Sequence, residues 1–266
     1  MVTRPDLVRG LRELGVSSGQ TLLVHSSVRA IAGADGLVVG GPVAVVDALT
    51  DALGASGTLV MPAHSASLSE PANWSNPPID PTFWPTVREL WPAFRADETP
   101  TQGVGVVPEV FRSMDGVLRS DHPQLSFCAR GPAATALLAE HPLAGGLGEG
   151  GPLGRLVDAG AYCLLLGAGW ESCTAFHLAE HALPEPPRVT EGAPVLRDGR
   201  REWVTFETLA YDADDFGALG AAFEATGAPA TGTVGHAHCR VFELPAAVDF
   251  ATGWLRANRV SGPASS

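Results

Sequence analysis

The sequence contains no lysine: all 17 of its basic residues are arginine. A Schiff-base enzyme and a Walker-type phosphate loop each need a lysine side chain, so this absence excludes pyridoxal-phosphate enzymes and P-loop kinases. The sequence also lacks an apolar run long enough to cross a bilayer. Its first ten residues carry Arg4, Asp6 and Arg9 where a signal peptide has an apolar core, so we expect a cytoplasmic protein.

Cysteine is scarce, and its pattern is uninformative for metal binding. The spacings of Cys128, Cys163, Cys173 and Cys239 are wide and irregular, so we expect buried thiols and no metal, with a nucleophilic Cys173 as the less favoured alternative. The formal net charge is −12, which argues against nucleic acid as a partner and suits a cationic ligand. We expect no membrane association, and either a monomer or a homodimer.

The composition is that of a globular protein, with 45% hydrophobic and 17% charged residues in a chain of 266. Leu7, Leu11 and Leu14 recur at helical spacing, and Gly15 follows them as a helix-ending glycine. Apolar runs at residues 21–25 and 57–61 predict buried strands, and a helix begins between them at residues 40–42. The order helix, strand, helix, strand is typical of an α/β sandwich with parallel strands.

The remaining elements are expected after residue 107. We predict helices over residues 107–114, 132–140, 152–159, 173–183 and 216–225, with one more near the C-terminus. We predict strands over residues 125–129 and 162–166, and near Val195, Trp203, Thr231 and Val241.

A proline-rich insert, residues 62–100, interrupts this pattern with eight prolines. A segment of this length is either a disordered linker or a functional covering loop. It also contains Trp74, Trp84 and Trp91, and three large aromatic side chains that need burial favour an ordered loop. We therefore expect the insert to form a wall of an active-site cleft.

The clearest chemical cluster is formed by Thr174, His177, Glu180 and His181 on the helix predicted over residues 173–183. Residues three and four apart share one helix face, so Glu180 is expected beside His177. A carboxylate next to an imidazole fixes its tautomer and stabilises the imidazolium. Both effects allow the imidazole to act as a general base. An ordinary surface pair has the same spacing, and spacing alone does not separate the two.

The same segment also matches the H-x-x-E-H pattern of inverted zinc peptidases. In that alternative His177 and His181 bind zinc and Glu180 is the base. A third ligand is needed, and His236, His238 or Glu207 are the candidates, but no downstream motif selects one.

Three further patterns are compatible with ligand binding. The glycine-rich run at residues 146–151 follows a predicted helix instead of a strand, so we interpret it as a flexible or close-packed loop and not a dinucleotide site. The segment at residues 25–29 ends a strand with two hydroxyls and an arginine, and residues 40–42 begin a helix; both positions suit a phosphate. Carboxylates that could hold a polycation are Glu70, Asp80, Asp97, Glu98, Asp212, Asp214 and Asp215.

The motifs, taken in order, resemble the aminoglycoside 3-N-acetyltransferases. The resemblance is carried by LLVHSS at residues 22–27, GGP at 40–42, GTLVMP at 57–62, NW at 73–74, TPT at 99–101, PEVFR at 108–112, HPQLSF at 122–127, GPLG at 151–154 and the Thr174-x-x-His177-x-x-Glu180 spacing. It covers roughly residues 21 to 183 and is weaker over the last third, where VG at 234–235 and RVF at 240–242 are still similar.

This resemblance implies a three-layer α/β/α sandwich around a mixed, partly parallel sheet, distinct from the common GNAT acetyltransferase fold. It implies one antibiotic N-acetyltransferase domain over residues 1–260, followed by a frayed tail at 261–266. The enzyme would bind acetyl-coenzyme A and an aminoglycoside together and transfer the acetyl group directly to an amino group, expected to be the 3-amino group. The biological result would be antibiotic resistance.

Residue roles follow from the same resemblance. His177 would remove a proton from the attacking amine, Glu180 would orient His177, and Thr174 would position the thioester or its developing oxyanion. The residues expected to line the coenzyme A channel are Ser26, Ser27, Val28, Arg29, Gly41, Ser126 and Phe127. The residues expected to bind the cationic substrate are His25, Glu70, Asp80, Asp97 and Glu98.

One departure from the family pattern bears on the substrate. The segment Gly235-His236-Ala237-His238 brings two histidines to a place where smaller polar residues are expected. The acceptor is therefore either an aminoglycoside or another amine. Besides the zinc hydrolase, a third alternative is a non-catalytic protein that binds an acyl-coenzyme A or a drug.

Overall fold

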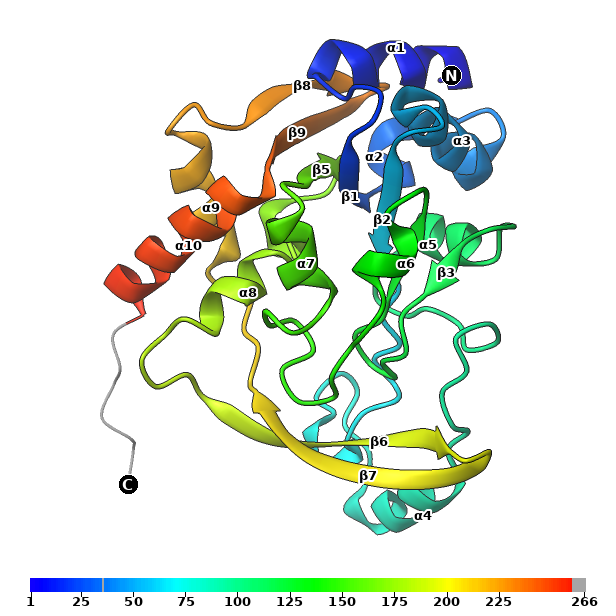
Figure 1. The fold of residues 1–266 in the computed structure, drawn as a ribbon, viewed down its shortest axis with the longest axis vertical. Helices are drawn as coiled ribbons and strands as arrows, with labels where there is room; N and C mark the ends of the chain where they lie inside the picture. Colours follow the sequence, from blue (N-terminus) through cyan, green and yellow to red (C-terminus); the bar gives the residue numbers. More distant parts are fainter. Residues whose placement is uncertain (35, 260–266) are drawn as a thin grey trace.

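The computed structural model describes residues 1–34 and 36–259 of the chain. Its centre is a seven-stranded sheet with the strand order β3-β4-β2-β1-β5-β9-β8, and a separate two-stranded ribbon, β6-β7, lies below it (Figure 1). The strands are β1 (Thr21–Ser26), β2 (Thr58–Pro62), β3 (Leu118–Arg119), β4 (Phe127–Arg130), β5 (Tyr162–Leu166), β6 (Arg188–Arg197), β7 (Arg200–Leu209), β8 (Ala230–Val234) and β9 (Ala237–Glu243).

Helices cover both faces of this sheet. The α-helices are α1 (Arg4–Leu14), α2 (Val28–Ala32), α3 (Gly41–Leu53), α4 (Trp84–Leu90), α5 (Val106–Arg112), α6 (Ala134–Leu137), α7 (Pro152–Asp158), α8 (Phe176–Glu180), α9 (Phe216–Glu224) and α10 (Leu244–Asn258). Short 3-10 turns are η1 (Pro71–Asn73), η2 (Pro81–Phe83) and η3 (Trp170–Ser172). In the part of the chain that the structure describes, no helix is long and apolar enough to span a bilayer.

The three central strands are parallel. β1 pairs in parallel with β2 on one side and with β5 on the other, whereas β4, β3, β9 and β8 join the sheet in antiparallel orientation. The carboxyl ends of β2, β1 and β5 therefore meet at one edge of the sheet, where α/β proteins place their ligand sites.

Successive residues of the central strands enter two different cores. Leu22 and Val24 of β1 pack with α1 and α3 on one face, whereas Leu23 packs on the opposite face with α7 and α10. In β5, Leu164 and Leu165 divide in the same way. A strand buried on both faces needs apolar residues at every position, which is why these strands are continuous apolar runs. The predicted three-layer sandwich with a mixed sheet is confirmed.

Local signals set the element ends. Thr3 caps α1 in a capping box with Asp6, and Gly15 ends it with φ of 110°. The helix predicted over residues 173–183 is too long at both ends. The chain runs through η3 before it, and beyond Glu180 the amides of His181 to Leu183 bond three residues back instead of four. Thr174 therefore precedes α8 instead of lying on it.

Other predictions of elements differ in detail. The predicted helix over residues 132–140 is the four-residue α6, and neither α2 nor α4 was expected. The two strands expected near Val195 and Trp203 are confirmed, but they form the separate ribbon and not part of the main sheet. The expected frayed tail, residues 261–266, lies outside the described residues.

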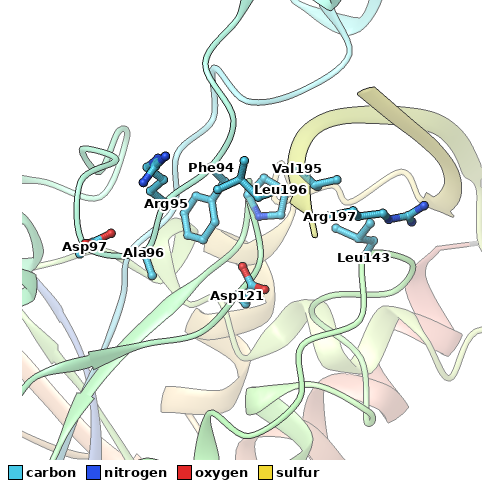
Figure 2. Close-up of a pocket in the computed structure, with 10 residues that line it drawn as sticks. Phe94, Arg95, Ala96, Asp97, Asp121, Leu143, Val195, Leu196 and Arg197 are labelled. Carbon is cyan, nitrogen blue, oxygen red and sulfur yellow. The ribbon is translucent and has the colours of Figure 1, made fainter. Parts of the chain in front are cut away.

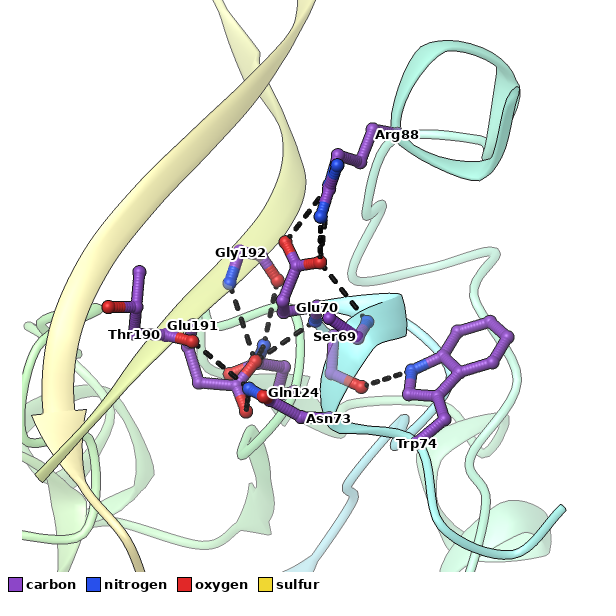
Figure 3. A network of polar contacts seen from close by, with 10 residues as sticks. Ser69, Glu70, Asn73, Trp74, Arg88, Gln124, Thr190, Glu191 and Gly192 are labelled. Carbon is purple, nitrogen blue, oxygen red and sulfur yellow. Dashed lines mark hydrogen bonds and ion pairs between the residues drawn. The ribbon is translucent and has the colours of Figure 1, made fainter. Parts of the chain in front are cut away.

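The proline-rich insert is ordered and packs against the ribbon. Figure 3 shows the polar network between them, in which Glu191 of β6 accepts hydrogen bonds from the amide of Glu70 and from the side chains of Asn73 and Gln124. The indole of Trp74 donates to Ser69 at 2.8 Å and packs edge-on against Trp91. The tryptophans thus help to hold the insert together, as an ordered loop requires.

Candidate active site

The segment after β5 brings a histidine to the carboxyl edge of the sheet. Gly167 turns the chain with φ of 71°, and a Cβ there would lie 2.8 Å from the Cβ of Ala30, so only glycine fits. Trp170 in η3 then anchors the segment: its indole donates to Glu224 at 3.1 Å and its ring stacks on Phe176. α8 begins at Phe176, and its next residue is His177.

His177 and Glu180 form a close pair. Nδ1 of His177 lies 2.6 Å from Oε2 of Glu180, and the carboxylate is 2% exposed. The imidazole packs against the rings of Tyr211 and Phe216, with centroid distances of 5.2 and 4.7 Å. With Nδ1–H donated to the carboxylate, Nε2 is left to accept a proton.

The carboxylate of Glu180 is held from its other side. Oε1 accepts hydrogen bonds from the amide of Asp212 at 3.1 Å and from the guanidinium of Arg259. Arg259 is in turn paired with Asp215 at 2.6 Å, and the two carboxylates raise the pKa of its guanidinium. A buried charge is tolerated when it is paired and hydrogen-bonded, and the side chain of Glu180 is both paired and hydrogen-bonded.

A cavity of about 370 Å³ opens in front of His177. One side is formed by the segment after β5, including Glu171, Thr174 and His177; the other is formed by the ends of β1 and β2 and by residues 103–108. Its lining residues are His25, Ser26, Pro62, His64, Gly103, Val104, Gly105, Pro108, Ala168, Glu171, Ser172, Thr174 and His177.

Three imidazoles line this cavity, but their surroundings differ. Burial lowers the pKa of His25 to about 4 and that of His64 to about 3, and in both the proximity of other imidazoles adds to the effect. Neither ring is a useful base near pH 7, because it remains neutral and holds a proton only weakly. His177 alone among the three has a carboxylate on its Nδ1. Of the three imidazoles, His177 therefore has the surroundings that suit a general base.

Comparison with known proteins shows the family of this chain. A family model described as aminoglycoside 3-N-acetyltransferase matches residues 23–256. The chain belongs to this family. The aminoglycoside N(3')-acetyltransferase-like protein YokD, derived from the SPbeta prophage of Bacillus subtilis, is 44% identical over 254 residues, which are 95% of this chain and 92% of YokD.

Two solved structures of the family superpose closely on this chain. An acetyltransferase described as AAC-IIIb, in a binary complex with CoASH, is 30% identical with a TM-score of 0.85 and covers 99% of both chains. AAC-VIa bound to sisomicin is 31% identical with a TM-score of 0.85, and the match covers 98% of this chain and 99% of that one.

The predicted coenzyme-channel residues of this family member are dispersed. Ser26 lines the cavity. Ser27 uses its hydroxyl to cap α2, on which Val28 packs against the core and Arg29 is exposed. Gly41 is the first residue of α3.

Ser126 and Phe127 do not fit the predicted role, because both are 0% exposed. The hydroxyl of Ser126 donates to the carbonyl of Ala63 and accepts from Arg119, and Phe127 packs edge-on against His64. Ser126 and Phe127 therefore pack behind Ala63 and His64, and neither side chain is exposed to a ligand.

The predicted substrate-binding carboxylates do not converge on one cleft. Glu70 is 7% exposed and is bound to Arg88 and to the amide of Ala72 (Figure 3). Asp80 caps η2 through the amide and hydroxyl of Thr82. These two acids stabilise the insert, because turns and 3-10 ends need acceptors for free backbone amides.

The other two predicted acids lie at different cavities. Asp97 lines a cavity of about 440 Å³ with Phe94 and Arg197, where the insert meets the ribbon (Figure 2). Glu98 lines a third cavity near Trp91. The carboxylate in the cavity of His177 is Glu171, which the sequence did not single out. Of the predicted substrate residues, only His25 lies there.

The H-x-x-E-H histidines do not share a ligand position. Nδ1 of His177 faces Glu180, whereas Nε2 of His181 lies 3.0 Å from the hydroxyl of Tyr211, and His181 does not line the cavity. Among the described residues, no group of three or more His, Cys, Asp or Glu side chains is arranged to hold a metal ion. Cys173 is fully buried, as are the other three thiols.

Two other sequence features are structural. Of the two alternatives for the glycine-rich run, the structure shows the close-packed loop: a Cβ at Gly146 would lie 2.6 Å from Nε2 of His122, and one at Gly148 would lie 2.9 Å from the ring of His181. His236 and His238 lie around the β8–β9 turn and do not line the cavity. The two histidines that depart from the family pattern therefore do not contact a substrate inside the cavity.

Sequence reasoning missed His64 and Arg259. His64 lies two residues after the end of β2, and a polar residue just past a buried strand was a usable signal. Arg259 reaches Glu180 across 79 residues of sequence, and no local pattern indicates that contact.

Proposed function

We propose that this chain transfers the acetyl group of acetyl-coenzyme A directly to an amino group of an aminoglycoside, with His177 as the general base. The acceptor position is the 3-amino group, in keeping with the family description. The observation that carries the proposal is the His177–Glu180 pair at 2.6 Å, which opens onto a cavity with room for two reacting groups.

The residues perform four tasks in this reaction. His177 takes a proton from the attacking ammonium at Nε2, because only the free amine is a nucleophile. Glu180 holds Nδ1–H and stabilises the imidazolium that forms. Glu171 attracts the cationic acceptor into the cavity, and Thr174, which is 7% exposed, positions the acyl group. As the new C–N bond forms, the thioester C–S bond breaks, and His177 passes its proton to the leaving thiolate. The nitrogen keeps one hydrogen in the amide product and releases its remaining extra proton to solvent.

The residues present also suit a coenzyme A thioester. Three residues that line the cavity, His25, Ser26 and His64, each have a buried polar atom with no protein partner, which favours a site for a polar ligand. Ser26 lies at the cavity, and Ser27 to Arg29 with Gly41 continue away from it over α2 and α3. We place the coenzyme along this path. Residues 1–260 act as one catalytic domain in the cytoplasm, and drug resistance is the biological result.

A thiol-release assay tests the proposal. Coenzyme A should appear only when acetyl-coenzyme A and an aminoglycoside are both present, in a panel that includes bulky aminoglycosides and unrelated amines. His177→Ala should lower kcat about a hundredfold or more. Its matched control is His181→Ala, on the same segment but outside the cavity.

The same pair of variants separates the alternatives. A zinc hydrolase built on both histidines would lose activity equally in the two variants and would contain zinc. A purely binding protein would gain thermal stability from its ligand without forming product. Unchanged kcat in His177→Ala would refute the assignment of the base.

A further inference from the structure

Three imidazoles follow the strand order at the carboxyl edge of the sheet. His64 follows β2, His25 lies on β1, and His177 follows β5, which are three adjacent parallel strands. All three line the cavity. The base stands at one end of this row, and the proposed reaction gives the other two imidazoles no role.

Buried polar atoms without partners gather in the same place. Within residues 1–34 and 36–259, five buried side-chain polar atoms lack a hydrogen-bond partner. Three of them belong to cavity residues: Nε2 of His25, Oγ of Ser26 and Nε2 of His64. An unpaired buried polar atom costs about 1–3 kcal/mol, so a cluster of three around one cavity points to a ligand that pairs with them.

The cavity is divided by charge. The side that carries His25, Ser26 and His64 contains no carboxylate, whereas the side after β5 contains Glu171 and the paired base His177. Burial keeps both imidazoles on the first side neutral, with pKa values of about 4 and 3. A cationic amine is attracted to the side of Glu171. An uncharged oxygen is the better partner for the side of the neutral rings.

A neutral imidazole can act as an electrophile. Its single N–H donates to a carbonyl oxygen and stabilises the negative charge that develops there, without adding a proton to the site. Direct acyl transfer needs this function, because the thioester oxygen gains charge when the amine attacks its carbon.

We propose that His64 and His25, assisted by Ser26, form a hydrogen-bonding subsite for the carbonyl oxygen of the acyl thioester. The inference rests on the proposed function, since it takes an acyl-coenzyme A as the ligand. It assigns the two ends of the imidazole row to different atoms: the base acts on the amine, and the neutral pair acts on the carbonyl. His64 contacts the reacting group and is a catalytic residue in this assignment.

The test compares His64→Phe with His64→Gln. Phenylalanine keeps the ring that packs at 5.6 Å against Phe127 but has no donor, whereas glutamine retains a donor close to Nε2. His25→Gln is a second variant, and His236→Phe is the matched control for a histidine outside the cavity. Circular dichroism and thermal melting establish that each variant is folded.

Binding provides a readout that does not depend on turnover. By calorimetry, the folded wild type should bind acetyl-coenzyme A about 5–10-fold more tightly than coenzyme A, the ratio expected for one or two hydrogen bonds. His64→Phe should abolish that ratio, and His64→Gln should restore part of it. In turnover, His64→Phe should lower kcat about a hundredfold. KM for the amine and the pH dependence of kcat should stay as in the wild type, because the base is intact.

The outcomes separate the two proposals. If the wild type acetylates an amine but His64→Phe keeps both the binding ratio and kcat, the subsite is refuted and the function stands. Equal losses of acetyl-coenzyme A and coenzyme A binding in His64→Phe would show a general structural role and would also refute it. If the wild type binds neither compound, the proposed function fails and the subsite fails with it.

Discussion

The hydrogen bonds around Glu180 lead to a specific prediction for the Glu180→Gln variant. Oε1 accepts from the amide of Asp212 and from Arg259, and Oε2 faces Nδ1 of His177. Glutamine has only one side-chain oxygen, and two donors require it at the Oε1 position. Its NH₂ group must then face Nδ1 of His177. Nδ1 becomes an acceptor, the ring proton moves to Nε2, and the base can no longer take a proton from the amine.

The expected loss of activity is large compared with the loss of stability. Removing a positioned base costs about 10²–10⁴-fold in rate, or about 2.7–5.4 kcal/mol of transition-state stabilisation. The folded state keeps the shape and the hydrogen bonds, and Arg259 keeps Asp215 as its ionic partner. We therefore expect the free energy of unfolding to fall by only about 1–3 kcal/mol.

Thiol-release kinetics at saturating substrates measure kcat, and nitrogen NMR of His177 reports which ring nitrogen carries the proton. The matched control is Glu70→Gln. Glu70 is also buried and ion-paired, to Arg88, and accepts from the amide of Ala72, but it lies outside the cavity. The control should lose stability and keep kcat. A Glu180→Gln enzyme with wild-type kcat, or with Nδ1 of His177 still protonated, would refute the reasoning.

Three further predictions concern the supports of the site. Arg259→Met should lower the free energy of unfolding by about 2–4 kcal/mol and reduce kcat, because Glu180 loses a charged partner; urea unfolding and steady-state rates would show this, and unchanged values would contradict it. Acid should destabilise the protein: burial lowers the pKa of His25 and His122 to about 4, so their contribution is complete above about pH 6.5 and is lost as pH falls toward 4. Each should contribute up to about 1.4 kcal/mol per pH unit in that window, and a urea midpoint that stays constant from pH 7 to 4.5 would be inconsistent with this. Arg119→Leu should loosen the proline-rich insert, because its guanidinium donates to the carbonyls of Ala63 and Thr99 at the two ends of that segment; limited proteolysis within residues 66–98 should accelerate at least several-fold, and an unchanged digestion rate would argue against this role.

The central sheet could be predicted because its signals are local. β1, β2 and β5 are buried on both faces, so the middle of each is a run of consecutive apolar residues that a sequence shows directly. The limits of α8 could not be predicted. Its length depends on Trp170, which is fixed by distant contacts with Glu224 and the α9 glycine Gly220. The hydrophobic periodicity of residues 173–183 does not indicate those contacts.

The difference between local and long-range signals also explains which site residues could be predicted. The pair of His177 and Glu180 is three residues apart, and spacing predicted it correctly. The carboxylates expected to bind the substrate do not line the cavity of His177. Composition could not show this, because it does not say which acids cap turns and which face a cavity. Glu70 and Asp80 both serve as turn caps, whereas Glu171 faces the cavity. That choice depends on the packing of the insert against the ribbon.

The anchoring of Glu180 by Arg259 has a practical consequence for work with this chain. The arginine follows α10 directly, 79 residues beyond the carboxylate that it holds. Truncation of the chain to Asn258 would remove Arg259 and take this ionic partner from Glu180 without touching any bound molecule. A preparation shortened in this way should be compared with the longer one by specific activity before a low rate is assigned to a poor substrate.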